Sequence, residues 1–304
     1  MARITIDGYR QPMPATEQQY RRLEVGDILY FPATPFPLTA EERSFLLAQK
    51  QSSAFHKNIS YRPNSDRLKG VDQKDESQRQ RMHHVMRAYS QRAVAFMASF
   101  LPRYAPNWRI DFASFRPIEE EGRDVALRSR NDLIHVDSFP SRPSYGDRLL
   151  RVFSNIHPER PRVWVTSDAF EELARQYAKH AGLPCSPTVL SRLRGGALGL
   201  LSGVGLPVVN RPEYDRFMLR FHHWMKESQT FQQNCHKDRW EFPPGSSWIV
   251  FTDTTSHSCI SGQYALEQTF IVSRSSLVWP EKAPIAIMEQ MAGFPLAPVQ
   301  ARSA

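Results

Sequence analysis

The sequence predicts a mostly β protein with helices, in which a jelly-roll core is interrupted by a helical insertion. Three observations favour this fold class: an amphipathic helix precedes a run of short strand-like segments, helices then surround a glycine-rich stretch, and strand-like segments return before a proline-rich tail. The 23 prolines and 14 glycines fall mostly between these periodic segments and exclude a long coiled coil. A jelly roll keeps a polar mouth between its sheets, where metal and ligand sites are commonly built.

The first half contains one amphipathic helix. Its apolar residues recur with the 3.6-residue period of an α-helix, and Pro102 ends it; they are Met82, Val85, Met86, Tyr89, Ala93, Phe96, Met97 and Phe100. Residues 50–78 before it are polar and rich in turn formers, which predicts an irregular segment that is mobile or faces a substrate, with disorder as the alternative.

Strand-like segments and helices follow one another in the rest of the chain. Strands are expected at 108–112, 133–139, 148–156, 162–166, 246–253 and 262–273. One helix is expected from Ser167 to Gly182 and another after Pro212, with the glycine-rich 194–207 between them as a crossover or lid. We therefore predict a single catalytic domain, 1–304. It comprises an N-terminal helical support region (1–105), a jelly-roll core (106–275) with the helical insertion at 167–240, and a C-terminal tail (276–304).

Composition restricts the partners and the compartment. The formal net charge of +8 favours anionic partners, but the basic residues are dispersed and do not form the long runs of nucleic-acid tails, so no nucleic acid is expected. No apolar run approaches the roughly 18 residues of a membrane span, and the first residues lack the apolar stretch of a secretory signal. Three cysteines without CxxC spacing predict neither disulfides nor structural zinc. We expect a cytoplasmic protein.

His135 and Asp137 are separated by one residue within a predicted strand, so their side chains project from the same face and could share a metal. This motif is weak alone, and its alternative is a surface histidine beside a turn aspartate. A 2-His-1-carboxylate triad needs a second histidine from a neighbouring strand. His257 is the candidate, because it lies between two strand-like segments late in the chain.

The other histidines are weaker candidates. His222 and His223 lie on a predicted helix, where His223 points to solvent and His222 flanks the apolar stripe, as non-ligands usually do. His83 and His84 lie outside the stripe of the first helix, and His157 resembles a turn residue. A metal role for His236, in a polar loop, stays open.

Three protein ligands on one face of an octahedral Fe(II) leave room for 2-oxoglutarate and O2. The sequence has no HExxH motif, which a helix of a zinc hydrolase would carry. The distal carboxylate of 2-oxoglutarate needs a donor, and an arginine fork binds carboxylates best. The strand about ten residues beyond His257 carries Gln268 and Thr269 in place of arginine. We expect Arg151 to bind this carboxylate, with Arg162 in reserve and with Asn155 and Gln268 as further contacts; the alternative for each arginine is an exposed strand position.

Several segments together resemble the Kdo 3-hydroxylase family over most of the chain. They are SFRPIEEEGR (114–123), IHVDSFPSRPSYGDRLLRVFSNIHPERPRVW (134–164), FMLRFHHWMK (217–226), FPPGSSWIVFTDTTSH (242–257) and SGQYALEQTF (261–270). The resemblance implies a double-stranded β-helix core and Fe(II)/2-oxoglutarate-dependent hydroxylation of 3-deoxy-D-manno-oct-2-ulosonic acid (Kdo) to Ko in the Kdo–lipid A inner core of lipopolysaccharide. It also implies that His135 and Asp137 are paired iron ligands and that His257 is the distal one.

Under this resemblance the acceptor is a Kdo-containing lipid A precursor with carboxylates and phosphates, for which Arg116 and Arg142 are candidate contacts. Peripheral contact with the cytoplasmic face of the inner membrane is a hypothesis based on the basic charge and the amphiphilic acceptor. The oligomeric state stays open, a homo-oligomer included. Two alternatives also stay open: a dioxygenase acting on a protein side chain or metabolite, and a non-catalytic cupin-like module binding acidic glycan or nucleic acid.

Overall fold

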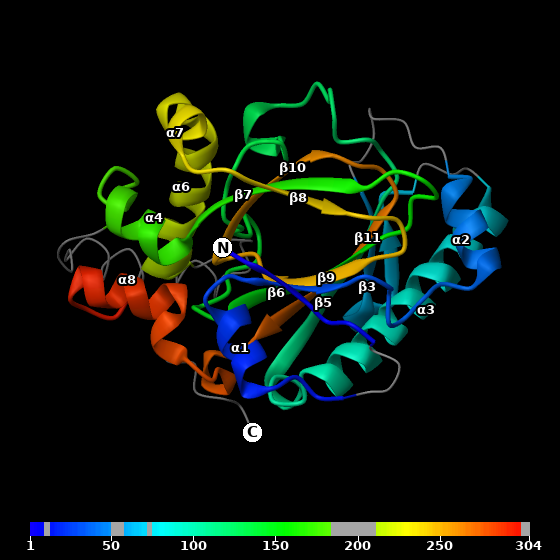
Figure 1. Cartoon of the computed structure of the whole chain (residues 1–304), viewed down its shortest axis with the longest axis horizontal. Helices are drawn as coiled ribbons and strands as arrows, with labels where there is room; N and C mark the ends of the chain where they lie inside the picture. The colour runs from blue at the N-terminus through cyan, green and yellow to red at the C-terminus, as the bar shows by residue number, and fades with distance from the viewer. Residues whose placement is uncertain (9–12, 50–57, 72–74, 184–210, 299–304) are drawn as a thin grey trace, which may run out of the picture.

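The structure, a computed structural model, describes residues 1–8, 13–49, 58–71, 75–183 and 211–298, and its strands form two sheets (Figure 1). The larger sheet has the order β1 (Arg3–Thr5), β2 (Ile28–Phe31), β9 (Ser247–Phe251), β6 (Arg148–Asn155), β11 (Ala265–Val272), β5 (Trp108–Arg116), β3 (Ile59–Arg62) and β4 (Arg67–Lys69). The smaller sheet has the order β10 (Thr255–Ser261), β7 (Arg162–Ala169) and β8 (Asp238–Phe242).

Strands from before the helical segment pair with strands from after it. β6 lies between β9 and β11, and β7 lies between β8 and β10, with every one of these pairs antiparallel. The late strands therefore insert beside the early ones, which is how His257 on β10 comes to lie next to residues more than a hundred positions earlier.

Large aromatic side chains fill the interior between the two sheets. Phe153 and Trp248 from the larger sheet pack against Trp164 and Phe242 from the smaller one, with the rings of Phe242 and Trp248 stacked at a centroid distance of 3.9 Å. Stacked and edge-on aromatic pairs stabilise a core beyond the area that they bury. This cluster keeps the interior below the candidate site apolar.

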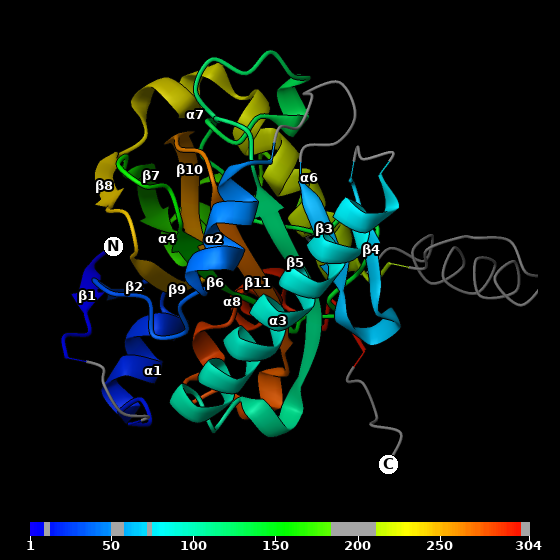
Figure 2. The same cartoon turned by 90° about the vertical axis from the view of Figure 1, so that its right-hand side faces the viewer.

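Helix α3 (Glu76–Phe100) packs on the opposite face of the larger sheet, across β5 and β11 (Figure 2). The Asp75 side chain caps its first turn, and the predicted apolar stripe is buried; Phe96 and Phe100 lie edge-on to Phe31 of β2. The prediction of this helix is confirmed. Two shorter helices, α1 (Glu17–Glu24) and α2 (Ala40–Leu47), each begin with a threonine capping box.

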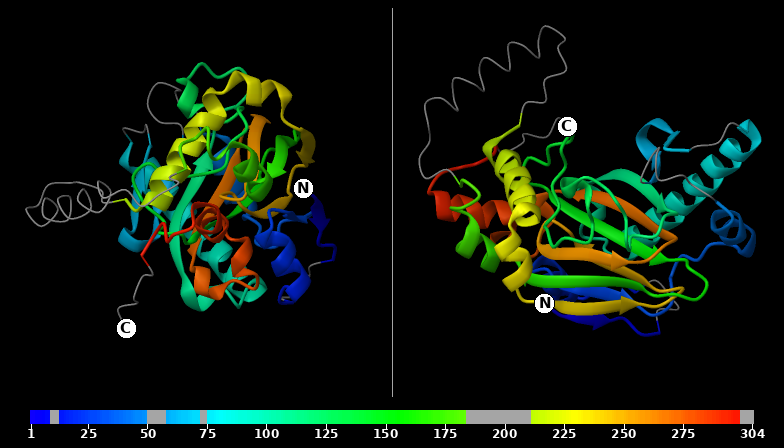
Figure 3. Two further views of the ribbon diagram at one scale, coloured as in Figure 1. Left: turned by 90° about the vertical axis from the view of Figure 1, so that its left-hand side faces the viewer. Right: turned by 90° about the horizontal axis from the view of Figure 1, so that it is seen from above.

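A second group of helices lies at the other end of the sheets from α2 and α3 (Figures 1 and 3). It consists of α4 (Phe170–Tyr177), α6 (Glu213–Glu227), α7 (Gln229–Asn234) and α8 (Pro284–Ala292). Aromatic residues hold the group together: Phe170 of α4 lies edge-on to Phe221 of α6, which stacks on Phe217 and Trp224 of the same helix. The side of α6 that is not used in this packing faces the candidate site.

Most expected strands are confirmed: β5, β6, β7, β9 and β11 lie where they were predicted, and α6 follows Pro212. The expected strand at 133–139 is wrong, because this segment forms only an isolated bridge between His135 and His257. The expected irregularity of 50–78 is wrong at β3 and β4, where Ile59 and Tyr61 alternate inward and pair with β5. The helix that was expected to begin at Ser167 is α4, and it begins at Phe170 because β7 continues to Ala169.

The N-terminal region supplies helices and also the two outermost strands at each end of the larger sheet, β1 with β2 and β3 with β4, and the expected tail contains α8. The division of the chain into regions stays a prediction. The glycine-rich 194–207 lies outside the described residues. Within the described part of the chain, no helix is long and apolar enough to cross a membrane.

Candidate active site

The backbone at 135–137 brings the three predicted metal ligands together. His135 and His257 exchange two backbone hydrogen bonds of 3.0 and 2.9 Å, and the Asp137 amide donates to the Thr252 carbonyl at 2.7 Å. As a result, Nε2 of His135 lies 3.5 Å from Oδ1 of Asp137, and Nε2 of His257 lies 4.0 Å from Oδ2. The isolated bridge between His135 and His257 therefore positions these side chains, although a full strand was expected at 133–139.

Both histidines present the same ring nitrogen to Asp137. Nδ1 of His135 bonds the Leu133 carbonyl at 2.7 Å, and Nδ1 of His257 bonds the Thr255 carbonyl at 2.8 Å. A carbonyl accepts only from a protonated Nδ1, so Nε2 of each ring carries the free lone pair that a metal needs. Burial lowers the pKa of both histidines, which keeps them neutral.

A third histidine, His222 of α6, also reaches this centre. Its ring centroid lies 4.8 Å from that of His135, and its ligand atom lies within 4.8 Å of those of His135 and Asp137. Its Nδ1 bonds the Val136 carbonyl at 2.7 Å, and burial lowers its pKa to about 4. The sequence interpretation of His222 as a non-ligand flanking the apolar stripe did not foresee this position.

Lys226, one turn after His222, is the other site residue that the sequence analysis missed. It is 4% exposed, and its ammonium donates to the Arg128 carbonyl at 3.0 Å. Burial lowers its pKa to about 8 against the opposing charges of Asp137 and Asp132. The i, i+4 spacing of His222 and Lys226 was the available signal, because it places both on one face of the helix.

Arg151 links Asp137, one of the predicted metal ligands, to the interior between the sheets. Its Nη1 lies 3.1 Å from Oδ2 of Asp137 and 3.2 Å from Oε1 of Glu267. Burial alone would raise the pKa of Asp137, but the Arg151 and His135 side chains outweigh it, and the pKa falls well below its usual value. Asp137 is therefore an ionised carboxylate.

Beyond Arg151, buried charges form what we call the arginine cluster: Arg116, Arg123, Arg151 and Arg162 with Glu120 and Glu267. Burial favours the neutral form of Glu267, but Arg151 and Arg116 lower its pKa to about 2. Four positive charges face the negative charges of Glu120 and Glu267, and Asp137, which also pairs with Arg151, brings the excess of positive charge down to one. Nε of Arg123, Arg151 and Arg162 is buried without a hydrogen-bond partner among the described residues.

Such a buried excess of positive charge is costly unless an anion compensates it. The neutral thiol of Cys259, two residues after His257, does not, because burial raises its pKa to about 11. One carboxylate of a bound ligand would balance the cluster and accept from its unpartnered donors.

Two of the expected cosubstrate contacts lie elsewhere. The Asn155 amide donates to the carbonyls of Arg160 and Phe242 and thereby fixes a turn. The Gln268 amide accepts from Ser90 of α3 and donates to the Asp111 carbonyl, so it faces the helix. On β11, Glu267 and Thr269 face the interior instead, and the Thr269 hydroxyl donates to Glu267 at 3.1 Å.

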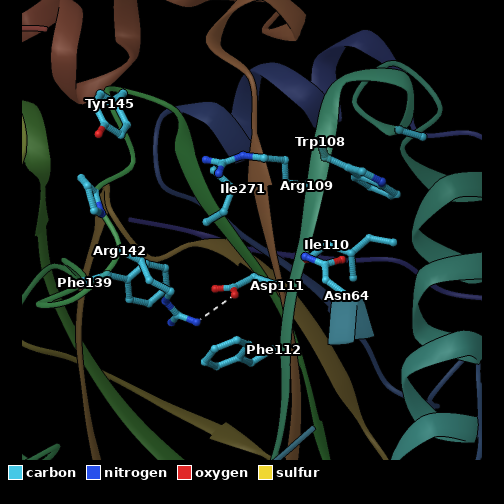
Figure 4. Close-up of a pocket in the computed structure, with 12 residues that line it drawn as sticks. Asn64, Trp108, Arg109, Ile110, Asp111, Phe112, Phe139, Arg142, Tyr145 and Ile271 are labelled. Atoms are coloured by element: carbon cyan, nitrogen blue, oxygen red, sulfur yellow. Dashed lines mark hydrogen bonds and ion pairs between the residues drawn. The ribbon is translucent and has the colours of Figure 1, made fainter. Parts of the chain in front are cut away.

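The two expected acceptor contacts are separated. Arg116 is bonded to Glu267 inside the arginine cluster. Arg142 instead lies in the wall of a cavity of about 820 Å³, between β5 and the loop after Asp137, where it pairs with Asp111 (Figure 4).

The sequence model of the 3-deoxy-D-manno-oct-2-ulosonic acid (Kdo) hydroxylases matches residues 9–295. The chain belongs to the Kdo hydroxylase family. It is similar to the crystal structure of the Kdo hydroxylase KdoO, a non-haem Fe(II) α-ketoglutarate-dependent dioxygenase, in complex with α-ketoglutarate and Fe(III). That match has 34% identity and a TM-score of 0.83 and covers 100% of both chains. No curated protein sequence matches the chain.

Two further KdoO structures support the family assignment. The apo structure also matches with 34% identity, a TM-score of 0.83 and 100% coverage of both chains. The complex with succinate and Fe(III) matches with 34% identity, a TM-score of 0.82 and 99% coverage of both chains. Both matches cover at least 99% of the chain, so the family assignment applies along its length.

Proposed function

We propose that this Kdo hydroxylase adds a hydroxyl group to C3 of Kdo, giving Ko, in a Kdo-containing lipid A precursor. The observation that carries the proposal is the meeting of two imidazole nitrogens with the Asp137 carboxylate, beside a buried arginine cluster that has an excess of positive charge. Fe(II) and 2-oxoglutarate are the cofactor and cosubstrate of this family's dioxygenase, KdoO. We also propose that the two sheets form a double-stranded β-helix, or jelly roll.

The donor set suits Fe(II). We propose His135, Asp137 and His257 as its ligands, since two neutral imidazoles and one carboxylate form the facial triad of non-haem iron oxygenases. The backbone carbonyls that bind each Nδ1 fix the tautomer and orient the ring. When bound, the iron with 2-oxoglutarate and O2 supplies the oxidising chemistry, which yields succinate and carbon dioxide.

The arginine cluster suits the cosubstrate. 2-Oxoglutarate is a dianion, and Arg151 and Arg162 each hold a buried Nε without a hydrogen-bond partner among the described residues. Arg162 is 2% exposed, so a carboxylate bound to it would be shielded from water. We propose that the distal carboxylate enters this cluster, with Arg162 as its main partner. In the part of the chain that the structure describes, Arg162 has one carboxylate neighbour, Glu120 at 3.6 Å, whereas Arg151 lies between two closer ones, Asp137 at 3.1 Å and Glu267 at 3.2 Å.

The surrounding residues keep the site dry. Trp164 stacks on the ring of His257 at a centroid distance of 4.8 Å and closes the interior on that side. Water exclusion strengthens the pairing of buried charges and protects a reactive centre from side reactions.

Mass spectrometry of a purified Kdo–lipid A precursor, incubated with and without the enzyme, tests this function. We expect a gain of one oxygen on Kdo that requires Fe(II) and 2-oxoglutarate. Oxidation of a protein side chain or metabolite in its place would reassign the acceptor, and iron-independent binding without turnover would favour a non-catalytic module.

We further propose that the enzyme works at the cytoplasmic face of the inner membrane, where its basic surface would contact anionic lipid. Sedimentation with anionic vesicles that weakens as salt increases would support this placement. Failure to bind such vesicles even at low salt would contradict it.

A further inference from the structure

The cavity beside the metal centre combines aromatic rings with charged groups. Its volume of about 820 Å³ lies within the range of about 300–1,000 Å³ that is usual for ligand pockets. Phe112 and Asp111 on β5 form one wall, and Phe139 and Arg142 on the loop after Asp137 form the facing wall (Figure 4). The function proposed above assigns no role to this arrangement.

Arg142 is held firmly in place within this cavity. Its Nη1 lies 2.8 Å from Oδ1 of Asp111. Its guanidinium carbon lies 3.8 Å from the ring centroid of Phe112 and 4.3 Å from that of Phe139. Stacking on two rings and one ion pair fix a side chain that would otherwise lose rotational freedom on binding a ligand.

Donors and acceptors in this wall still lack partners. Nε of Arg142 and Oδ2 of Asp111 are buried without a hydrogen-bond partner among the described residues. Buried polar atoms are nearly always satisfied. A ligand that offers both an anionic acceptor and a hydroxyl donor would satisfy them.

The cavity lies close to the proposed metal centre. Arg151 lies 3.1 Å from Asp137, and its guanidinium carbon lies 5.5 Å from the Phe139 ring. A smaller recess that touches Asp137 shares Phe139 and Arg142 with the cavity. A ligand stacked on Phe139 would therefore lie one side chain away from the iron ligand.

We propose that this cavity binds the acidic sugar itself, with the Arg142 guanidinium taking the sugar carboxylate, Asp111 accepting from a sugar hydroxyl, and Phe112 and Phe139 packing against its C–H faces. The inference rests on the proposed function and makes Arg142 the residue that selects an acidic sugar over a neutral one. The cavity is larger than one sugar and leaves room for the linked glycan.

Binding of Kdo and of its neutral carboxamide analogue tests this assignment. Each would be titrated by calorimetry into the protein loaded with 2-oxoglutarate and Co(II), which prevents turnover. The wild type should bind the acid roughly 10- to 100-fold more tightly than the amide, as expected for a charge-assisted hydrogen bond. Arg142→Gln should bind both equally.

Arg21→Gln is the matched control, because it removes the same charge from an exposed ion pair with Glu17 on α1. It should keep the wild-type preference for the acid, and unchanged Co(II) and 2-oxoglutarate binding by Arg142→Gln would show that this variant is folded. A preference for the acid that persists in Arg142→Gln overturns the inference while the proposed function stands. A wild type that shows no Kdo-dependent succinate formation overturns both.

Discussion

The metal centre has a strand side and a helix side, and the two sides orient their histidines differently. On the strand side, His135 and His257 each donate from Nδ1 to the carbonyl two residues earlier in their own segment. On the helix side, Nδ1 of His222 bonds the Val136 carbonyl, which belongs to another segment. Local backbone geometry thus presets the strand histidines, whereas His222 takes its orientation only when α6 docks.

The electrostatic surroundings differ in the same way. His257 stacks on the apolar Trp164, whereas His222 lies one helical turn from the buried Lys226. A cation beside a ligand position disfavours a second cation and favours an anion. We infer that the strand side holds the iron.

The largest expected effect separates the two sides through iron binding. His257→Ala should weaken Fe(II) binding by at least about 100-fold, because loss of a direct ligand exceeds the 10- to 100-fold cost of losing its outer partners. Calorimetric titration under anaerobic conditions measures the affinity. His236→Ala, whose side chain is 57% exposed, is the control and should bind iron normally. Loss of iron from His236→Ala with retention by His257→Ala would reverse the assignment.

A second effect should appear in the pH dependence of stability of the metal-free protein. The folded pKa of His222, about 4, lies below its ordinary 6.5 because of burial, so the unfolded chain takes up a proton first as the pH falls. Neutral His222 therefore contributes up to about 3 kcal/mol to the free energy of unfolding. This contribution is present above pH 6.5 and is lost as the pH falls toward 4. Between pH 7 and 4, the free energy of unfolding measured with urea should fall less in His222→Gln than in the wild type. An identical pH dependence in the two proteins would mean that His222 is not buried and neutral.

The strand side should also determine cosubstrate affinity. Arg162→Gln is expected to raise the KM for 2-oxoglutarate roughly 10- to 100-fold, because the distal carboxylate loses a charge-assisted bond. Lys226→Met on the helix side is the comparison. Steady-state succinate formation at varied 2-oxoglutarate gives both values. If Lys226→Met raises this KM and Arg162→Gln does not, the cosubstrate extends toward α6 and not into the arginine cluster.

The smallest expected effect concerns iron binding by the helix side. His222→Ala should weaken Fe(II) binding by less than about 10-fold, since it removes a neighbour of the centre and not a proposed ligand. The titration used for His257→Ala applies here as well. Equal losses in His222→Ala and His257→Ala would erase the distinction between the two sides.

The strand side was largely predictable from the sequence, and the helix side was not. The one-residue spacing of His135 and Asp137 and the place of His257 among strand-like segments carried the prediction, although the structure replaces the expected first strand by a bridge. His222 and Lys226 are buried because the segment around Arg128 and Val136 covers that face of α6. The helical period alone cannot supply this long-range contact.

The arginine cluster shows a second feature that could not be predicted from the sequence. Which face of β11 points inward depends on its register with β5, and that register shifts between Gln268 and Phe270. The sequence analysis therefore directed Gln268 toward the cosubstrate, whereas Glu267 faces the interior and Gln268 bonds α3. Arg116 was assigned to the acceptor for the same reason, since its pairing with Glu267 became visible only in the folded sheet.

The central claim is that the centre around Asp137 couples 2-oxoglutarate to hydroxylation of Kdo, and oxygen labelling tests it most directly. With O2 carrying a heavy isotope, the account predicts one labelled atom in succinate and one in the Kdo product, formed in equal amounts by the wild type and absent from His257→Ala. Labelled succinate without label in Kdo, or labelled Kdo from His257→Ala, would contradict it.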